Sequence, residues 1–115
     1  MKLNNEEQKI LNEYVEELNS RKKMTKEEVE ELLSDLENNA YDVYRSLIQN
    51  YLFYAYNIAK TYSAEELTLL DFIHAANEGL EIGVTSNEYE DYDSFIKCID
   101  AAIKSSIELM LSYLD

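Results

Sequence analysis

Residues 40–62, AYDVYRSLIQNYLFYAYNIAKTY, decide the fold because they form the most apolar stretch of the chain. Their apolar side chains recur at the three- and four-residue spacing of one helix face, and they are Val43, Leu47, Ile48, Leu52, Ala55, Ile58, Ala59 and Tyr62. Further aromatic residues widen this face almost all the way round the helix, namely Tyr41, Tyr44, Tyr51, Phe53, Tyr54 and Tyr56. A helix that is apolar on most sides lies in the middle of its domain or carries a binding surface. We therefore predict a central helix here.

The composition of the whole chain favours helices over strands. Its 115 residues include no Pro and only two Gly, fewer turn residues than a fold of many short strands needs. Hydrophobic residues make up 46%, which is enough to bury a core. We predict an all-α fold, a compact bundle of about five helices in a single domain that spans residues 1–115. Two N-terminal helices are expected in residues 1–38, and the rest of the bundle in residues 40–115.

The two N-terminal helices are predicted from their apolar stripes and from one capping signal. The first covers residues 5–18 and ends in a polar, basic turn. The second begins at Thr25, whose hydroxyl can accept from the first free amides while Glu28 reaches back to the Thr25 N–H. The polar run Glu37-Asn38-Asn39 is expected to separate the second helix from the central one.

The C-terminal half predicts two more helices and an acidic loop between them. The fourth helix lies within residues 63–82, and capping boxes at Ser63 and Thr68 compete for its start. Gly83 is expected just past its C-terminus, where glycine is favoured. The fifth helix covers residues 94–114 and carries a stripe of isoleucines. The polar and acidic residues 85–93 between the two helices predict a solvated loop.

The negative charge is concentrated in the C-terminal half of the chain. The formal net charge is −14. Residues 1–62 hold 12 acidic and eight basic residues, whereas residues 63–115 hold 12 acidic residues and two basic ones, Lys97 and Lys104. Such a surface repels phosphate backbones and suits a basic protein partner. We expect no direct contact with nucleic acid.

Few residues point to catalysis or to a bound metal. One Cys and one His allow neither an internal disulfide nor a Cys/His zinc site. Asp71 stands three residues before His74, where a di-iron helix needs Glu. The acidic run at 88–93 lacks the spacing and the Gly of an EF-hand loop. We expect a non-enzymatic protein without cofactor or metal, and no membrane contact, since no leader or spanning segment is evident. A cytoplasmic location follows as an expectation.

Three short motifs in order resemble a known family. They are SLIQN at residues 46–50, IAKTY at residues 58–62 and LDFIHAANEGL at residues 70–80. In sequence and spacing they resemble region two of primary-type bacterial sigma factors, together with the helical region that precedes it. The resemblance covers roughly residues 25–107.

The resemblance implies a small helical bundle that binds the coiled coil of the largest subunit of RNA polymerase. In the family, the helix that matches residues 70–80 makes this contact. At the matching positions this chain has Asp71, His74, Ala75, Asn77, Glu78 and Leu80. The resemblance also favours Thr68 over Ser63 as the start of the fourth helix.

The chain departs from the family where the family handles promoter DNA. The Gln-Glu-Gly of the family is replaced by residues 74–76, His-Ala-Ala. Basic residues and an aromatic-rich helix follow in the family, and a cationic, stacking surface is what a melted strand requires. This chain instead has Glu88, Glu90, Asp91 and Asp93. We therefore expect that the ability to read DNA is lost.

Two functional hypotheses remain from the sequence. In the first, a sigma-like module modulates transcription by binding RNA polymerase or another basic protein surface. In the second, the chain mimics nucleic acid and blocks the basic channel of a nucleic-acid-binding enzyme, as a phage-type anti-defence inhibitor such as an anti-CRISPR protein would. The second hypothesis rests on Glu81, Glu88, Glu90, Asp91 and Asp93. A homodimer formed through the tyrosine-rich surface of residues 40–62 is a third arrangement.

Overall fold

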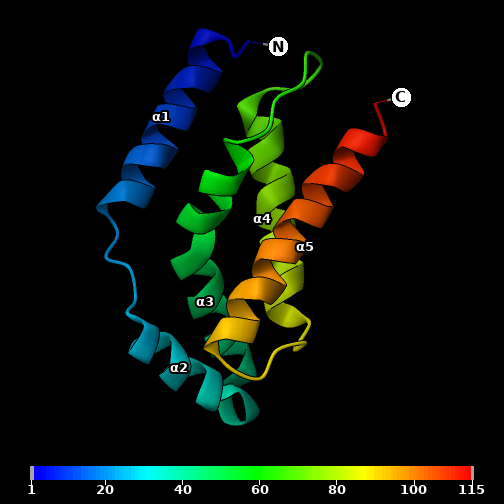
Figure 1. Cartoon of the computed structure of the whole chain (residues 1–115). Coiled ribbons are helices and arrows are strands. Elements are labelled where there is room, and N and C mark those ends of the chain that lie inside the picture. Colours follow the sequence, from blue (N-terminus) through cyan, green and yellow to red (C-terminus); the bar gives the residue numbers. More distant parts are fainter. Residues whose placement is uncertain (1, 115) are drawn as a thin grey trace.

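A computed structural model describes residues 2–114, and these residues form five helices joined by short connections (Figure 1). The helices are α1 (Asn5–Ser20), α2 (Lys26–Ser34), α3 (Leu36–Ala59), α4 (Leu69–Thr85) and α5 (Tyr92–Ser112). No residue within 2–114 lies in a strand. The prediction of an all-α bundle of about five helices is therefore confirmed.

The central position of α3 explains why its sequence is apolar on so many sides. It contacts each of the other four helices, and Figure 1 shows α1 beside it and α2 across its N-terminal end. The buried residues of α3 follow one helix face, and they are Val43, Leu47, Tyr51, Ala55, Tyr56 and Ala59. Not one of the helices described within residues 2–114 is both long and apolar enough to cross a membrane.

Four helices start with a capping box, which explains where the chain enters each of them. In α4, Thr68 Oγ1 accepts from the Asp71 N–H, and the Asp71 carboxylate accepts the Thr68 N–H at 2.8 Å. This geometry satisfies amides that a helix start otherwise leaves unpaired. The start at Thr68, rather than at Ser63, is confirmed. Thr25 and Glu28 form the predicted box at the start of α2.

One predicted boundary is present and another is wrong. The break expected at residues 37–39 occurs as a kink at Asn39, whose φ of −138° and ψ of 50° are not helical, and α3 continues on both sides of it. Gly83, expected beyond the end of α4, lies buried inside the helix, which continues to Thr85. The residue with a left-handed backbone after α4 is Asn87, at φ 58°, and Asn tolerates this conformation better than most residues.

A close contact between α4 and α5 explains why Gly83, and Gly79 one turn earlier, are glycines. A Cβ at Gly79 would lie 2.6 Å from the Ala102 carbonyl oxygen and 2.7 Å from the Ile103 Cα. A Cβ at Gly83 would lie 3.0 Å from the Ala102 Cβ and 3.1 Å from the Ile99 Cα. These neighbours are mostly backbone atoms of α5, which a side chain cannot push aside without moving the helix. The two glycines therefore set the distance between α4 and α5.

The Gly79→Ala substitution tests this close approach. Overpacking of a tight contact costs about 1–3 kcal/mol, which exceeds the roughly 1 kcal/mol that Ala gains over Gly in a helix. We therefore expect a net loss in the free energy of unfolding, measured by urea denaturation followed by circular dichroism. Gly83→Ala should lose less because its neighbours lie farther away.

The control is Asn57→Ala at an exposed position of α3, which should leave stability unchanged or raise it slightly. A Gly79→Ala variant as stable as this control would show that α4 and α5 do not need the glycine.

Candidate partner-binding surface

The outer side of α4 carries three of the six predicted polymerase-binding residues, Asp71, His74 and Glu78. His74, Glu78, Glu81 and Thr85 are exposed, and Asp71 is half-buried at the helix start. Their spacing of three, four, three and four residues places them on one side of the helix. We call Asp71, His74, Glu78 and Glu81 the outer face of α4. This face includes residues from both functional hypotheses, because Asp71, His74 and Glu78 were predicted to bind polymerase and Glu81 was predicted to mimic nucleic acid.

Asp71 has a structural role at the start of the outer face. Its Oδ2 atom accepts hydrogen bonds from the Thr68 N–H at 2.8 Å and from the Thr68 hydroxyl at 3.3 Å. A carboxylate near a helix N-terminus is also favoured by the helix dipole. Substitution of Asp71 would therefore change the start of α4 as well as any contact with a partner.

Leu80 and Ala75 do not belong to the surface, although the family resemblance places them at contact positions. Leu80 is 0% exposed and Ala75 is 7% exposed. Both residues point towards the packed side of α4, where Leu80 joins the core shared with α3 and α5. They correct the sequence-based site, because their side chains cannot reach a partner unless the bundle opens.

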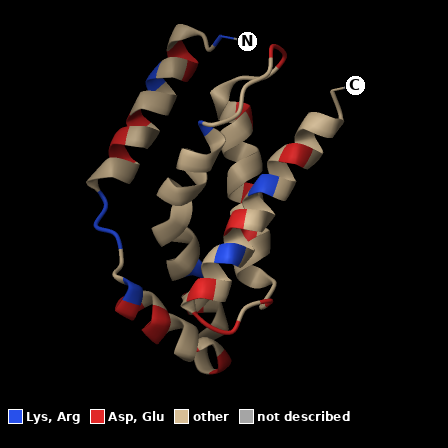
Figure 2. Cartoon of the chain, viewed as in Figure 1, with Lys and Arg blue, Asp and Glu red and all other residues tan. Residues whose placement is uncertain are grey.

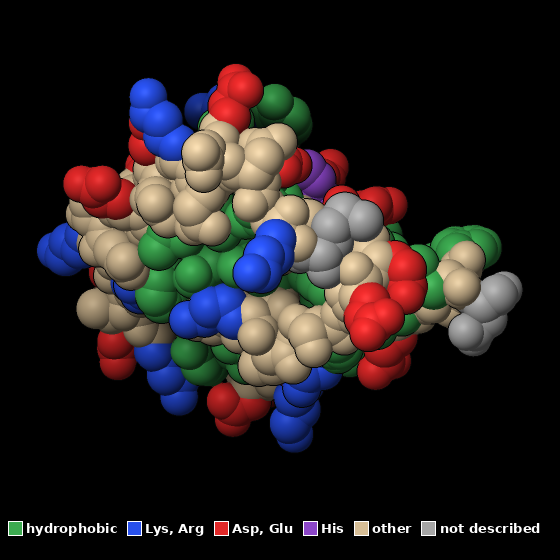
Figure 3. All heavy atoms as spheres, turned by 90° about the horizontal axis from the view of Figure 1, so that it is seen from above, with side chains coloured by type: hydrophobic (Ala, Val, Ile, Leu, Met, Phe, Trp, Pro, Cys, Tyr) green, Lys and Arg blue, Asp and Glu red, His purple; other side chains and the backbone are tan. Residues whose placement is uncertain are grey.

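Asn77 lies beneath α1 and is only partly accessible. Its Nδ2 atom donates to the Tyr14 hydroxyl at 3.3 Å. Its Oδ1 atom is buried and has no hydrogen-bond partner among residues 2–114. A separate hollow of about 470 Å³, which Asn77 does not line, opens between α1, α3 and α4 beside Leu11, Val15 and Leu69. Figure 3, seen from above, shows hydrophobic side chains exposed on this end of the molecule.

The α4–α5 loop is acidic outside and anchored inside by one tyrosine. Glu88 and Glu90 are exposed, as the sequence predicts. Tyr89 between them is half-buried, packs edge-to-face on Phe95 at 4.9 Å and donates its hydroxyl to the Val84 carbonyl. Burial raises the pKa of Tyr89 to about 12. The loop is therefore fixed in place, rather than fully solvated.

The last two acidic residues of the predicted set belong to the start of α5. Asp91 Oδ1 accepts from the Ser94 N–H at 2.9 Å, and hydrogen bonds from the backbone and side chain of Ser94 lower its pKa. Asp93 is exposed in the first turn of α5. The loop therefore ends at Asp91, two residues before the predicted end at Asp93. Figure 2 shows the acidic ribbon segments of this loop and of the start of α5.

Few of these carboxylates are neutralised. Within residues 2–114, ion pairs form between Arg21 and Glu17 and between Lys104 and Asp100. Glu78, Glu81, Glu88 and Glu90 take part in neither pair and are all exposed. Their charge is therefore available to a basic partner.

A shallow groove next to the outer face was not predicted from the sequence. It measures about 530 Å³ and runs between α4 and α5. Ile82, which is 55% exposed, and Glu88 line it together with several small residues. Those lining residues include Gly83, Ala101, Ala102 and Ser105. The sequence could have indicated this groove through its small residues, because small side chains on neighbouring helices leave a depression between them.

The described residues do not form a metal centre, and the comparisons add no family. No group of three or more His, Cys, Asp or Glu side chains within residues 2–114 is arranged to hold a metal ion. Comparison of the chain with protein-family models, with curated proteins and with solved structures gave no match. The site is therefore interpreted from its own geometry.

Alkaline titration tests the anchored loop. The pKa of Tyr89 is about 12 in the fold, whereas an unperturbed tyrosine has a pKa near 10. The neutral phenol favours the folded state, so its contribution is complete below pH 10 and is lost as the pH rises from about 10 to 12. Absorbance at 295 nm should show late tyrosine ionisation that coincides with unfolding.

The Tyr89→Phe variant distinguishes the ionisation of Tyr89 from that of Tyr54, because burial raises the pKa of Tyr54 to about 12 as well. The variant should lose one late-titrating phenol and should unfold over a broader, shallower alkaline range. Tyr113→Phe, at a 79% exposed position, is the matched control. If both variants lost the same late signal, the loop would not be anchored by Tyr89.

Proposed function

We propose that this chain is a sigma-like, non-enzymatic module that binds the coiled coil of the RNA polymerase largest subunit through the outer face of α4. The observation that carries the proposal is the correspondence between one motif and one helix. Residues 70–80, which resemble the polymerase-binding motif of sigma factors, all fall within α4. The helix begins at Thr68, the position that the resemblance favours.

The geometry of the outer face supports a helical partner. Exposed side chains spaced by three and four residues can pack along another helix, as they do in coiled coils. His74, Glu78 and Glu81 stand on this face outside the ion pairs found in the described part of the chain, and Glu78 and Glu81 favour a basic partner. We therefore assign the main contact to these three residues, with Asp71 holding the helix start.

The acidic α4–α5 loop argues for transcription control without promoter reading. Glu88 and Glu90 are exposed where the family has basic residues that face DNA. Carboxylates at such a place oppose a phosphate backbone by direct repulsion. On this proposal the module changes the activity of polymerase by occupying the coiled coil.

The double variant Glu78→Arg/Glu81→Arg tests the proposal. It reverses two charges on the outer face, so binding to purified core RNA polymerase should weaken at least tenfold, which corresponds to about 1.4 kcal/mol. Both side chains are exposed, and circular dichroism should show an unchanged fold. Biolayer interferometry with immobilised polymerase measures the affinity.

The matched control is Glu27→Arg/Glu30→Arg on α2, with the same spacing and the same change in charge at two exposed positions. The control should bind like the unmodified chain. Equal binding by both double variants, or no binding by the unmodified chain, would refute the proposed contact.

The second candidate function is inhibition of a nucleic-acid-binding enzyme by acidic mimicry. The observation that favours it is the set of exposed carboxylates at Glu81, Glu88, Glu90 and Asp93, outside both ion pairs. Carboxylates along a protein surface can substitute for phosphates in a basic channel.

Neutralisation of the loop tests mimicry. The variant Glu88→Gln/Glu90→Gln/Asp93→Asn keeps Asp91, because that residue caps α5. If the chain is a mimic, it should displace fluorescent DNA from a CRISPR effector nuclease, and the neutral variant should do so more weakly. Displacement should also weaken steeply between low and physiological salt. Salt-insensitive displacement would contradict mimicry.

A further inference from the structure

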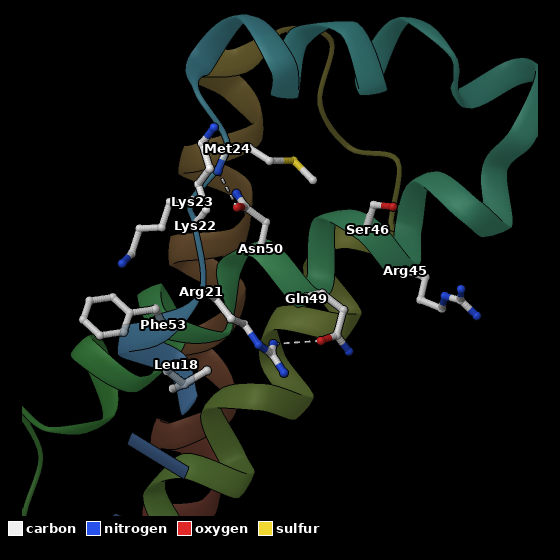
Figure 4. Close-up of a pocket in the computed structure, with 10 residues that line it drawn as sticks. All are labelled: Leu18, Arg21, Lys22, Lys23, Met24, Arg45, Ser46, Gln49, Asn50 and Phe53. Carbon is white, nitrogen blue, oxygen red and sulfur yellow. Dashed lines mark hydrogen bonds between the residues drawn. The ribbon is translucent and has the colours of Figure 1, made fainter. Parts of the chain in front are cut away.

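The linker between α1 and α2 forms a basic pocket with α3, on a different part of the molecule from the outer face of α4. The pocket measures about 470 Å³ (Figure 4). It is lined by Leu18, Arg21, Lys22, Lys23, Met24, Arg45, Ser46, Gln49, Asn50 and Phe53. Four of the ten basic residues of the chain line it, whereas no acidic residue within residues 2–114 does. This distribution stands out in a chain with a net charge of −14.

Two hydrogen bonds hold the linker against α3, so the pocket is formed before any ligand arrives. Arg21 Nη1 donates to Gln49 Oε1 at 2.8 Å, and the Met24 N–H donates to Asn50 Oδ1 at 2.8 Å. Figure 4 shows both bonds as dashed lines across the gap between linker and helix. A preformed site loses less conformational freedom on binding than a flexible one.

Most of the positive charge in the pocket is not neutralised. Arg21 pairs with Glu17 at 2.7 Å, whereas Lys22, Lys23 and Arg45 form no ion pair within residues 2–114. Lys22 is nevertheless near a carboxylate, because it adds to the Thr25 hydrogen bonds that lower the pKa of Glu28. The Lys23 ammonium lies 4.0 Å from the centre of the Phe53 ring, a cation–π contact that keeps this cation beside an apolar surface. Figure 2 shows the linker as a run of basic ribbon between α1 and α2.

We propose that this pocket binds a phosphorylated ligand of mononucleotide size. Lys22 and Lys23 supply positive charge for the phosphates, whereas Arg45, whose side chain points away from the linker in Figure 4, adds a weaker attraction from a greater distance. Phe53 and Met24 supply an apolar surface for a flat ring. The volume lies within the range of small-molecule sites, roughly 300–1,000 Å³. The site is independent of polymerase binding, because it shares no residue with the outer face of α4.

The net charge of the chain favours a small anion over a nucleic acid strand. At physiological salt, charges are screened beyond about 8 Å. A mononucleotide in the pocket therefore responds mainly to the nearby cations. A strand that extends beyond the pocket passes the carboxylates of a chain with a net charge of −14 and is repelled. The same argument excludes a long acidic segment of another protein.

Isothermal titration calorimetry of the whole chain tests the proposal with five probes. These are ADP, GDP, inorganic phosphate, a 15-residue oligothymidine strand and a hexaglutamate peptide. We expect at least one nucleotide to bind with Kd below about 1 mM, tighter than phosphate, strand or peptide. Lys22→Glu/Lys23→Glu should weaken this binding at least tenfold, and Arg45→Gln should weaken it to a smaller degree.

The ring surface and the charge are tested by separate variants. Phe53→Leu should bring nucleotide affinity close to that of inorganic phosphate, because leucine keeps an apolar side chain but not the flat ring. Lys2→Glu/Lys9→Glu makes the same charge change at two exposed positions outside the pocket and should bind like the unmodified chain. Circular dichroism confirms that each variant folds.

Three results would overturn the proposal. The first is the absence of nucleotide binding at 1 mM. The second is an equal loss in the control variant, which would assign the effect to net charge alone. The third is tighter binding of the strand or the peptide than of any nucleotide, which would identify a polymer site.

Discussion

The close approach of α4 and α5 is the constraint on which the rest of the structure depends. Gly79 and Gly83 let the backbone of α5 come so near that an added Cβ at Gly79 would lie 2.6 Å from a carbonyl oxygen. With the helices at this distance, Ile99 and Ile103 are fully buried. Because one side of α4 is committed to this contact and to α3, its remaining side must face outwards. The outer face, with His74, Glu78 and Glu81, is the consequence.

The α3 helix takes part both in the core shared with α4 and α5 and in the basic pocket. Its aromatic residues serve both sides: Tyr51 packs on Phe95 of α5 at 5.4 Å, and Phe53 lines the basic pocket next to the linker. Tyr54 donates to Asp100, and although burial alone would raise the pKa of Asp100, hydrogen bonds from Lys104 and Tyr54 lower it. All four cations of the pocket precede residue 62, and the carboxylates of the outer face and of the loop follow it.

The presence of each helix and the start of α2 were predictable from local signals, whereas the starts of α3 and α5 and the contacts between helices were not. Apolar periodicity and the capping pairs at Thr25 and Thr68 are local signals, and the structure confirms both. Gly83 was predicted to follow α4 because a glycine after an apolar stripe is typical of a helix end. The same glycine can instead allow a second helix to pack closely, and only the position of α5 shows that this is its role. The site shows the same limit. Leu80 matched a family position but lies in the core, and the basic pocket joins residues 18–24 to residues 45–53 across two helices.

The position of α1 restricts how a partner can reach α4. Tyr14 covers Asn77 through a hydrogen bond of 3.3 Å, and Leu11 and Leu18 are buried beneath the same helix. A partner that contacted Asn77 would have to displace Tyr14 and expose apolar surface, at a free-energy cost of about 25 cal/mol for each Å². Contact through His74, Glu78 and Glu81 requires no such displacement, because these side chains are already exposed. If α4 binds a partner as proposed, its uncovered half is the side that costs least to reach, and its exposed carboxylates would favour a basic partner.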